Sequence, residues 1–156
     1  MRKLKDLKTL KRIIRRQKRA GKKIVFTNGC FDIIHAGHIK VFNQAKAKGD
    51  ILILGLNSDA SIKRIKGPKR PIVDQACRAA VLAALEPIDF IVIFDENTPY
   101  ETIKTLQPDY LVKGGDWDKT KIIGSKLVKK VFRIKLVKGL STTNIIKKIV
   151  KAYGPK

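Results

Sequence analysis

The chain has 156 residues, with 35 lysines and arginines against 13 acidic residues, and a formal net charge of +22. This length fits one domain, residues 1–156, that can bury a hydrophobic core. No apolar run is long enough to cross a membrane, and the basic start lacks the apolar stretch of a signal peptide, so we expect a cytoplasmic protein. Two cysteines, Cys30 and Cys77, are too few for a disulfide framework and lack zinc-site spacing.

The positive charge is concentrated at the two ends of the chain. Residues 1–23 hold 12 lysines and arginines with one acid, residues 119–156 hold 12 with no acid, and residues 24–118 hold 11 against 12 acids. Solvated helix faces explain this pattern most simply, and a basic rim that attracts anionic substrates comes next. Dedicated nucleic-acid binding is disfavoured, because no aromatic platform or groove-reading motif accompanies the charge.

Helices and strands are predicted to alternate along the chain. A basic amphipathic helix is predicted for residues 1–21, from apolar residues at helical spacing: Leu4, Leu7, Leu10, Ile13 and Ile14. The following predicted elements are a strand (23–27), a helix (35–50), a strand (51–57), a short helix (58–65), a loop (66–71), a helix (74–87), a strand (89–94), a helix (98–107), a strand (109–115), a short helix (125–131), a strand (131–137) and a helix (141–153).

This alternation predicts an α/β fold: a Rossmann-like, doubly wound parallel sheet of five strands with helices on both faces. In such sheets ligands bind beyond the carboxyl ends of the strands, near the point where the strand order reverses. Segments rich in Asn and Gly follow three predicted strands: TNGCFD (27–32), NSD (57–59) and KGGD (113–116). We therefore expect a ligand site at this edge of the sheet.

The segment TNGCFDIIHAGH (27–38) holds the only two histidines, His35 and His38. A helix that begins near Ala36 places both at its first turn, where free N–H groups and the helix dipole favour phosphate. A capping His35 and a packed His38 are the structural alternative, and spacing alone does not decide. Two histidines with only Asp32 nearby make an incomplete metal site. Neither GxxxxGK[ST] nor GxGxxG occurs, so neither common phosphate cradle is present.

Three further segments combine loop or cap residues with charge. Residues 57–71 crowd five cations around a Gly/Pro loop, which is either an exposed basic loop or a clamp for phosphates. STTN (141–144) is expected to cap the last helix and, at that helix terminus, to grip phosphate. VKGGDWD (112–118) offers two glycines for close approach to a base or ribose, and its Trp117 packs on a loop in the structural alternative.

Taken in order, these segments resemble the cytidylyltransferase-like nucleotidyltransferases, whose HxGH hallmark corresponds to residues 35–38. The motifs NGCFDxxHxGH, NSDxSxKRxKGxxRP, VKGGDW, Gly124-Ser125 and GxSTTxII are similar to the bacterial D-glycero-D-manno-heptose 1-phosphate adenylyltransferases. The resemblance covers residues 22–150, which we expect to form the catalytic core of a stand-alone form. Two departures are Ala76-Cys77-Arg78, which keeps only the arginine of an acid–Gln–Arg pattern, and Leu136-Val137-Lys138, where glycerol-phosphate cytidylyltransferases carry an arginine.

The resemblance implies transfer of the adenylyl group of ATP, with Mg²⁺, to a sugar 1-phosphate, and an enzyme that forms a homodimer. It implies catalytic roles for His35, His38 and Lys66. Implied ATP-binding residues are Thr27, Gly29, Cys30, Phe31, Lys113, Gly114, Asp116, Ser141, Thr142 and Thr143. Implied contacts to substrate phosphate are Lys69, Arg70 and Arg78, the last of which alternatively braces the basic loop. Mg²⁺ is expected to be held mainly by ATP phosphates, with Asp32 as its nearest protein neighbour.

Other functions remain open at this point. A cytidylyltransferase for glycerol 3-phosphate or phosphoethanolamine, or an adenylyltransferase like FAD synthetase, shares the fold and HxGH. A basic nucleic-acid-binding module is a different class, and it leaves HxGH and STT unexplained.

Overall fold

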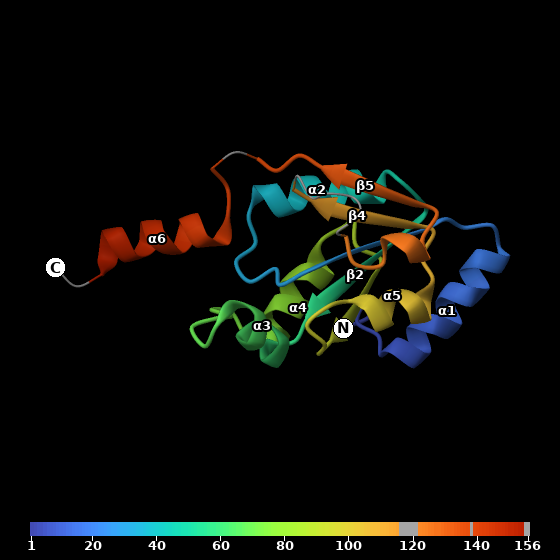
Figure 1. Cartoon of the computed structure of the whole chain (residues 1–156), viewed down its shortest axis with the longest axis horizontal. Helices are drawn as coiled ribbons and strands as arrows, with labels where there is room; N and C mark the ends of the chain where they lie inside the picture. The colour runs from blue at the N-terminus through green and yellow to red at the C-terminus, as the bar shows by residue number, and fades with distance from the viewer. Residues whose placement is uncertain (116–121, 138, 155–156) are drawn as a thin grey trace.

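The computed structural model describes residues 1–115, 122–137 and 139–154. Its elements, shown in Figure 1, are α1 (Leu7–Arg19), β1 (Ile24–Gly29), α2 (Ala36–Lys46), β2 (Ile51–Asn57), α3 (Asp59–Lys66), α4 (Gln75–Ala84), β3 (Phe90–Phe94), α5 (Tyr100–Leu106), β4 (Tyr110–Gly114), the 3-10 turn η2 (Ser125–Leu127), β5 (Lys130–Ile134) and α6 (Thr142–Tyr153).

The described strands form one parallel sheet in the order β3-β2-β1-β4-β5. The chain runs outward from β1 through β2 to β3, then returns to the other side of β1 and continues outward through β4 to β5. The predicted doubly wound α/β fold is confirmed. The strand order reverses between β1 and β4, so the carboxyl ends of these two strands border the crevice where such sheets bind ligands.

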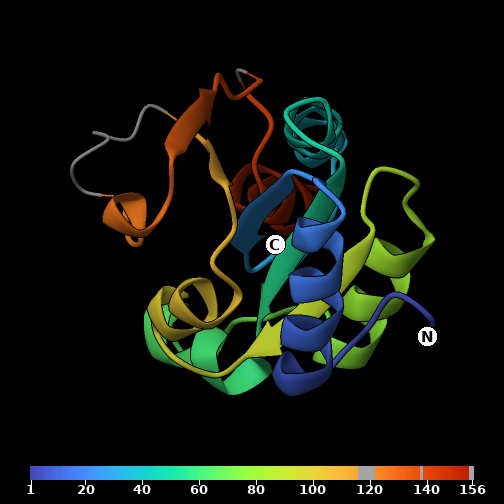
Figure 2. The same ribbon diagram turned by 90° about the vertical axis from the view of Figure 1, so that its right-hand side faces the viewer.

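Helices cover both faces of the sheet, as Figure 2 shows in a second view. On one face Val41 and Phe42 of α2 and Leu82 of α4 pack against Leu52 and Leu54 of β2. The other face forms a second cluster, which includes Leu10 and Ile14 of α1, Ile103 and Leu106 of α5, Phe26 and Ile53. Because successive strand residues point to opposite faces, a continuous apolar run such as 51–57 supplies both clusters.

Side-chain caps set where several helices begin. Asp6, Ser58, Asp74 and Ser141 each accept a hydrogen bond from a backbone N–H in the first turn of the helix that follows. Each cap satisfies an N–H group that has no partner within its helix. The predicted cap at Ser141 is confirmed.

Three predicted boundaries are wrong. The first helix, predicted for residues 1–21, begins only at Leu7, because Asp6 caps it and Leu4 instead bridges to Ile91 of β3. Helix α3 continues to Lys66, so this lysine ends a helix and does not lie in the loop. The helix predicted over 125–131 is one 3-10 turn, because Val128 and Val131 pack against the sheet cluster in extended chain.

Helix α6 projects from the body of the molecule in Figure 1. None of its residues is buried, and Ile149, Val150 and Tyr153 are 50%, 62% and 87% exposed. Among the described residues, no helix combines the length and apolar character needed to span a membrane.

Candidate active site

A cavity of about 330 Å³ opens at the carboxyl ends of β1 and β4, where the strand order reverses. We call it the histidine cavity. Its lining residues are Thr27, Asn28, Gly29, Cys30, Phe31, Asp32, His38, Val41, Lys66, Arg70, Gly114, Leu136, Thr142 and Thr143. The fold thus brings together most residues that the sequence marked as a phosphate site, from segments more than 100 positions apart.

His35 and His38 lie at the start of α2, as predicted. His35 is the N-cap residue but its side chain makes no capping hydrogen bond, so it is not the simple helix cap of the structural alternative. The two imidazoles stack, with ring centroids 3.8 Å apart and planes inclined by 20°. The buried Nδ1 atoms of both rings have no hydrogen-bond partner among the described residues. Buried polar atoms are usually paired, so each of these two atoms can still take part in one hydrogen bond.

Burial keeps both histidines neutral. Burial lowers the pKa of His35. Burial, together with the neighbouring His35, lowers the pKa of His38 to about 4. At neutral pH each ring therefore offers one N–H donor and one acceptor nitrogen rather than a fixed positive charge.

The aromatic residue Phe31 packs beside this pair. Its backbone adopts φ = +46°, a left-handed conformation that is rare for a bulky residue and recurs at functional sites. Its ring meets the His38 ring edge-on, with centroids 5.3 Å apart. A β-carbon at Gly29 would lie 3.0 Å from the Phe31 ring, so glycine is needed there for the ring to fold back.

The basic loop is anchored to the site through Asp32. The side chain of Asp32 is fully buried and forms an ion pair with Arg70, whose Nε lies 2.6 Å from Oδ2. The backbone N–H groups of Ile72 and Val73 also donate to this carboxylate. Burial raises the pKa of Asp32, but these hydrogen bonds outweigh it and hold the pKa below its usual value. Asp32 therefore braces the loop that brings Arg70 to the cavity.

The two loop lysines differ in position. Lys66, at the carboxyl end of α3, is exposed and lines the histidine cavity. Lys69 is exposed in the following turn and does not line it.

Arg78 of α4 is buried and connects several segments around the site. Its side chain is fully buried and pairs with Asp59, with Nη2 2.6 Å from Oδ1. The guanidinium also donates to the carbonyl oxygens of Cys30, Asn57 and Val73. These contacts join the ends of β1 and β2 to the end of the basic loop, which favours the bracing role of Arg78 over a phosphate contact.

The amino end of α6 closes another side of the cavity. Thr142 and Thr143 line it, and Ser141 lies just outside as the helix cap. The Thr142 hydroxyl donates to the carbonyl oxygen of Ile33, 3.4 Å away, which ties α6 to the histidine loop. Two helix amino ends, those of α2 and α6, therefore meet here, and each favours anionic groups.

Lys113 stands apart from this arrangement. Lys113 lines a neighbouring cavity instead, and its ammonium donates to the side-chain oxygen of Asn28. Asp116 and Trp117 lie outside the described residues. The residues that sequence reasoning missed are Asn28, Val41 and Leu136. Asn28 was visible beside Gly29, whereas nothing local distinguished Val41 from other apolar helix positions.

The described residues do not form a protein site for Mg²⁺. They contain no group of three or more His, Cys, Asp or Glu side chains that could hold a metal ion. Both carboxylate oxygens of Asp32 already accept hydrogen bonds from its loop partners.

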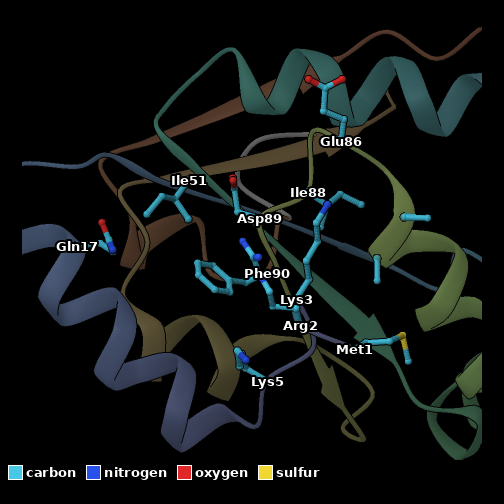
Figure 3. A pocket seen from close by; sticks show the side chains of 12 residues that line it. Met1, Arg2, Lys3, Lys5, Gln17, Ile51, Glu86, Ile88, Asp89 and Phe90 are labelled. Atoms are coloured by element: carbon cyan, nitrogen blue, oxygen red, sulfur yellow. The ribbon is translucent and has the colours of Figure 1, made fainter.

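A larger hollow of about 800 Å³ lies at the opposite edge of the sheet (Figure 3). It surrounds the start of the chain and the amino ends of β2 and β3, with Arg2, Lys3 and Asp89 among its lining residues. Its polar groups serve the fold: Lys3 donates to the carbonyl oxygen of Leu85, and Asp89 pairs with Lys46. It contains none of the motif residues.

Comparison with known proteins indicates the same family as the motif residues that line the site. Residues 26–148 match the cytidylyltransferase-like family. The chain is 54% identical over 156 residues to the bifunctional protein HldE of Geobacter metallireducens, covering 97% of this chain and 32% of the relative. It is 53% identical over 141 residues to the bifunctional protein HldE of Wolinella succinogenes, covering 90% of this chain and 30% of the relative. The chain thus spans about a third of the length of these relatives.

A solved structure shares the fold. The crystal structure of the lipopolysaccharide core biosynthesis protein from Thermoplasma volcanium superposes with a TM-score of 0.64 at 30% identity, covering 75% of this chain and 99% of that one. Together with the family match over most of the chain and the HxGH residues at the switch point, this places the protein in the cytidylyltransferase-like family.

Proposed function

We propose that the protein is an adenylyltransferase that joins ATP and D-glycero-D-manno-heptose 1-phosphate to give ADP-heptose and pyrophosphate. The product would serve lipopolysaccharide core or related glycan synthesis. The observation that carries the proposal is the convergence, in one cavity, of His38, Lys66, Arg70 and the amino end of α6. The names of the relatives, a bifunctional HldE protein and a lipopolysaccharide core biosynthesis protein, support the substrate class.

The reaction needs positioning and charge neutralisation more than a strong base. An oxygen of the sugar phosphate attacks the α-phosphorus of ATP, and the bond from that phosphorus to the bridging oxygen breaks as pyrophosphate leaves. Because the nucleophile is already an anion, no proton must be removed to activate it. Preorganised donors at the developing charge then lower the barrier.

The site supplies such donors on several sides. We assign His35 and His38 to the bridging and β-phosphate oxygens, where charge builds up as pyrophosphate leaves. Lys66, with Lys69 from its exposed turn, stabilises the α-phosphorus, and the STT segment with the amino end of α6 holds the triphosphate. Mg²⁺ would be held mainly by phosphate oxygens of ATP, where it would neutralise part of their charge.

The test is pyrophosphate release from the purified protein with ATP or CTP and a panel of acceptors. Heptose 1-phosphate with ATP should be the best pair. Glycerol 3-phosphate or phosphoethanolamine with CTP, or riboflavin phosphate with ATP, would point to the other family activities if it reacted faster. Salt-sensitive DNA or RNA binding without pyrophosphate release would favour the nucleic-acid-binding module.

Two variants test the assignments inside the site. His38→Ala should lower ADP-heptose synthesis by more than about tenfold, roughly 1.4 kcal/mol of barrier. Lys66→Ala should lower kcat. An unchanged kcat with a raised KM would assign Lys66 to substrate binding instead.

We further propose that the protein works as a homodimer in the cytoplasm, where ATP and sugar phosphates are available. Helix α6 supports the dimer, because its exposed Ile149, Val150 and Tyr153 lie on one side of the helix, away from its lysines. Light scattering should give twice the chain mass, and Ile149→Lys with Val150→Lys should give the chain mass. A monomeric wild-type protein would contradict this proposal.

A further inference from the structure

A second cavity adjoins the histidine cavity. It measures about 340 Å³, and we call it the lysine cavity. Its lining residues are Asn28, Gly29, Cys30, Asn57, Ile65, Asn97, Thr98, Pro99, Lys113, Gly114, Ile122 and Ile123. Four of these residues, Asn28, Gly29, Cys30 and Gly114, also line the histidine cavity. The two cavities therefore meet at the carboxyl ends of β1 and β4.

The lining of the lysine cavity suits a small polyhydroxylated molecule. Asn57, Asn97 and Thr98 contribute polar residues to its lining, and Ile65 and Ile122 contribute apolar ones. The Asn57 amide also donates to the Ser61 hydroxyl, and the Asn97 side-chain oxygen accepts from Arg64. Sugars combine hydroxyl groups with C–H faces, and small-molecule sites pair a few polar groups with an apolar lining in the same way. The histidine cavity has the opposite character, with three cationic or imidazole side chains and two helix amino ends.

Lys113 stands where the two cavities meet. It is half-buried, it precedes the shared Gly114 on β4, and its ammonium donates to the side-chain oxygen of the shared Asn28. An ammonium has three N–H donors, and Asn28 takes one. Burial lowers the pKa of Lys113 to about 8, and the neighbouring Cys30 opposes this shift. A desolvated ammonium of this kind gains most from an anionic oxygen.

We propose that Lys113 is the residue that selects the acceptor, binding the phosphate of the incoming sugar phosphate where the two cavities meet, with the sugar in the lysine cavity. This inference rests on the proposed function, and it moves Lys113 from the ATP side, where the family resemblance put it, to the acceptor side. A phosphate held near Asn28 and Gly114 would lie beside the histidine cavity, to which the proposed function assigns the triphosphate.

The experiment compares Lys113→Met and Lys113→Arg with wild type, and with Lys40→Met as control. Methionine keeps the length of the side chain without its donors, arginine keeps the charge, and Lys40 is exposed on α2 and lines neither cavity. In steady-state kinetics, Lys113→Met should raise the KM for heptose 1-phosphate about tenfold or more and leave the KM for ATP within about twofold. Lys113→Arg should recover part of the loss. A larger change in the KM for ATP, or none in that for the acceptor, would overturn the proposal.

Calorimetric titration separates this proposal from the proposed function. Each variant is titrated with heptose 1-phosphate and with ATP, so binding is measured without turnover. Loss of sugar-phosphate binding with retained ATP binding in Lys113→Met supports the role of Lys113. Wild type that binds the sugar phosphate but releases no pyrophosphate contradicts the proposed reaction alone. Wild type that binds no sugar phosphate, or Lys113→Met that binds it as well as wild type, overturns the inference.

Discussion

The rings of His35 and His38 stack face to face, 3.8 Å apart, at the first turn of α2. Only His38 lines the histidine cavity. His35 stacks on the His38 ring and, after burial, contributes to the lowered pKa of His38. The two rings therefore form one stacked unit, and the charge state of His38 depends in part on its neighbour.

Gly37 makes this stacking possible, so Gly37→Ala tests it. A β-carbon at Gly37 would lie 2.9 Å from Nδ1 of His35. The alanine should displace the His35 ring and lower kcat about tenfold or more. It should not lower the free energy of unfolding, because alanine favours a helix over glycine by about 1 kcal/mol. Activity measured beside circular dichroism melting checks both expectations, and full activity would show that the ring position does not matter.

The lowered pKa of His38 predicts a loss of stability in mild acid. The folded-state pKa of about 4 lies below the unfolded value of about 6.5. Between these values the unfolded chain binds the proton and the folded chain does not, so the free energy of unfolding falls as pH drops from 6.5 to 4. Urea unfolding at pH 7.5 and pH 5 should show a smaller loss in His38→Gln than in wild type.

Buried carboxylates contribute little to the change in stability between pH 6.5 and pH 4. The pKa values of Asp32 and Asp109 lie below the usual aspartate value, so their contributions are lost mainly below pH 4. An equal loss of stability in His38→Gln and wild type would contradict the burial of His38.

Local sequence patterns were enough for the elements and for the position of the histidines. The alternation of apolar runs and helical spacing gave the parallel sheet, and its topology then placed the segments 27–32 and 113–116 at one edge. A glycine, Gly67, directly follows the last residue of α3, Lys66, and its φ of +92° is a conformation that glycine adopts readily.

Contacts between distant residues were not predictable. Asp32 meets the backbone of residues 72 and 73, about 40 positions later, and no local pattern indicates that its oxygens are already occupied. Arg78 was expected either to contact phosphate or to brace the basic loop, and no local pattern indicates that the fold buries its side chain completely. The ring stacking of the histidines depends on χ angles that spacing does not encode.

The buried Asp32–Arg70 pair predicts a strong effect of Asp32→Ala. The variant leaves two backbone N–H groups and a partly buried guanidinium without their acceptor. Breaking a buried pair in this way costs about 3–5 kcal/mol of unfolding free energy. Urea unfolding measures it, with Arg70→Met and the double variant completing the cycle. Additive losses in the double variant would show that the two side chains are not coupled.

Variants of Arg78 test whether this residue braces the loop or contacts phosphate. If Arg78 is a brace, Arg78→Lys should lower the free energy of unfolding by about 3 kcal/mol or more, because one ammonium cannot reach Asp59 and three carbonyl oxygens together. Asp59→Asn should cost less, since the three carbonyl acceptors remain. Urea unfolding and the KM values for both substrates are measured on the same preparations. Unchanged stability of Arg78→Lys with a raised KM for either substrate would instead assign Arg78 to phosphate binding.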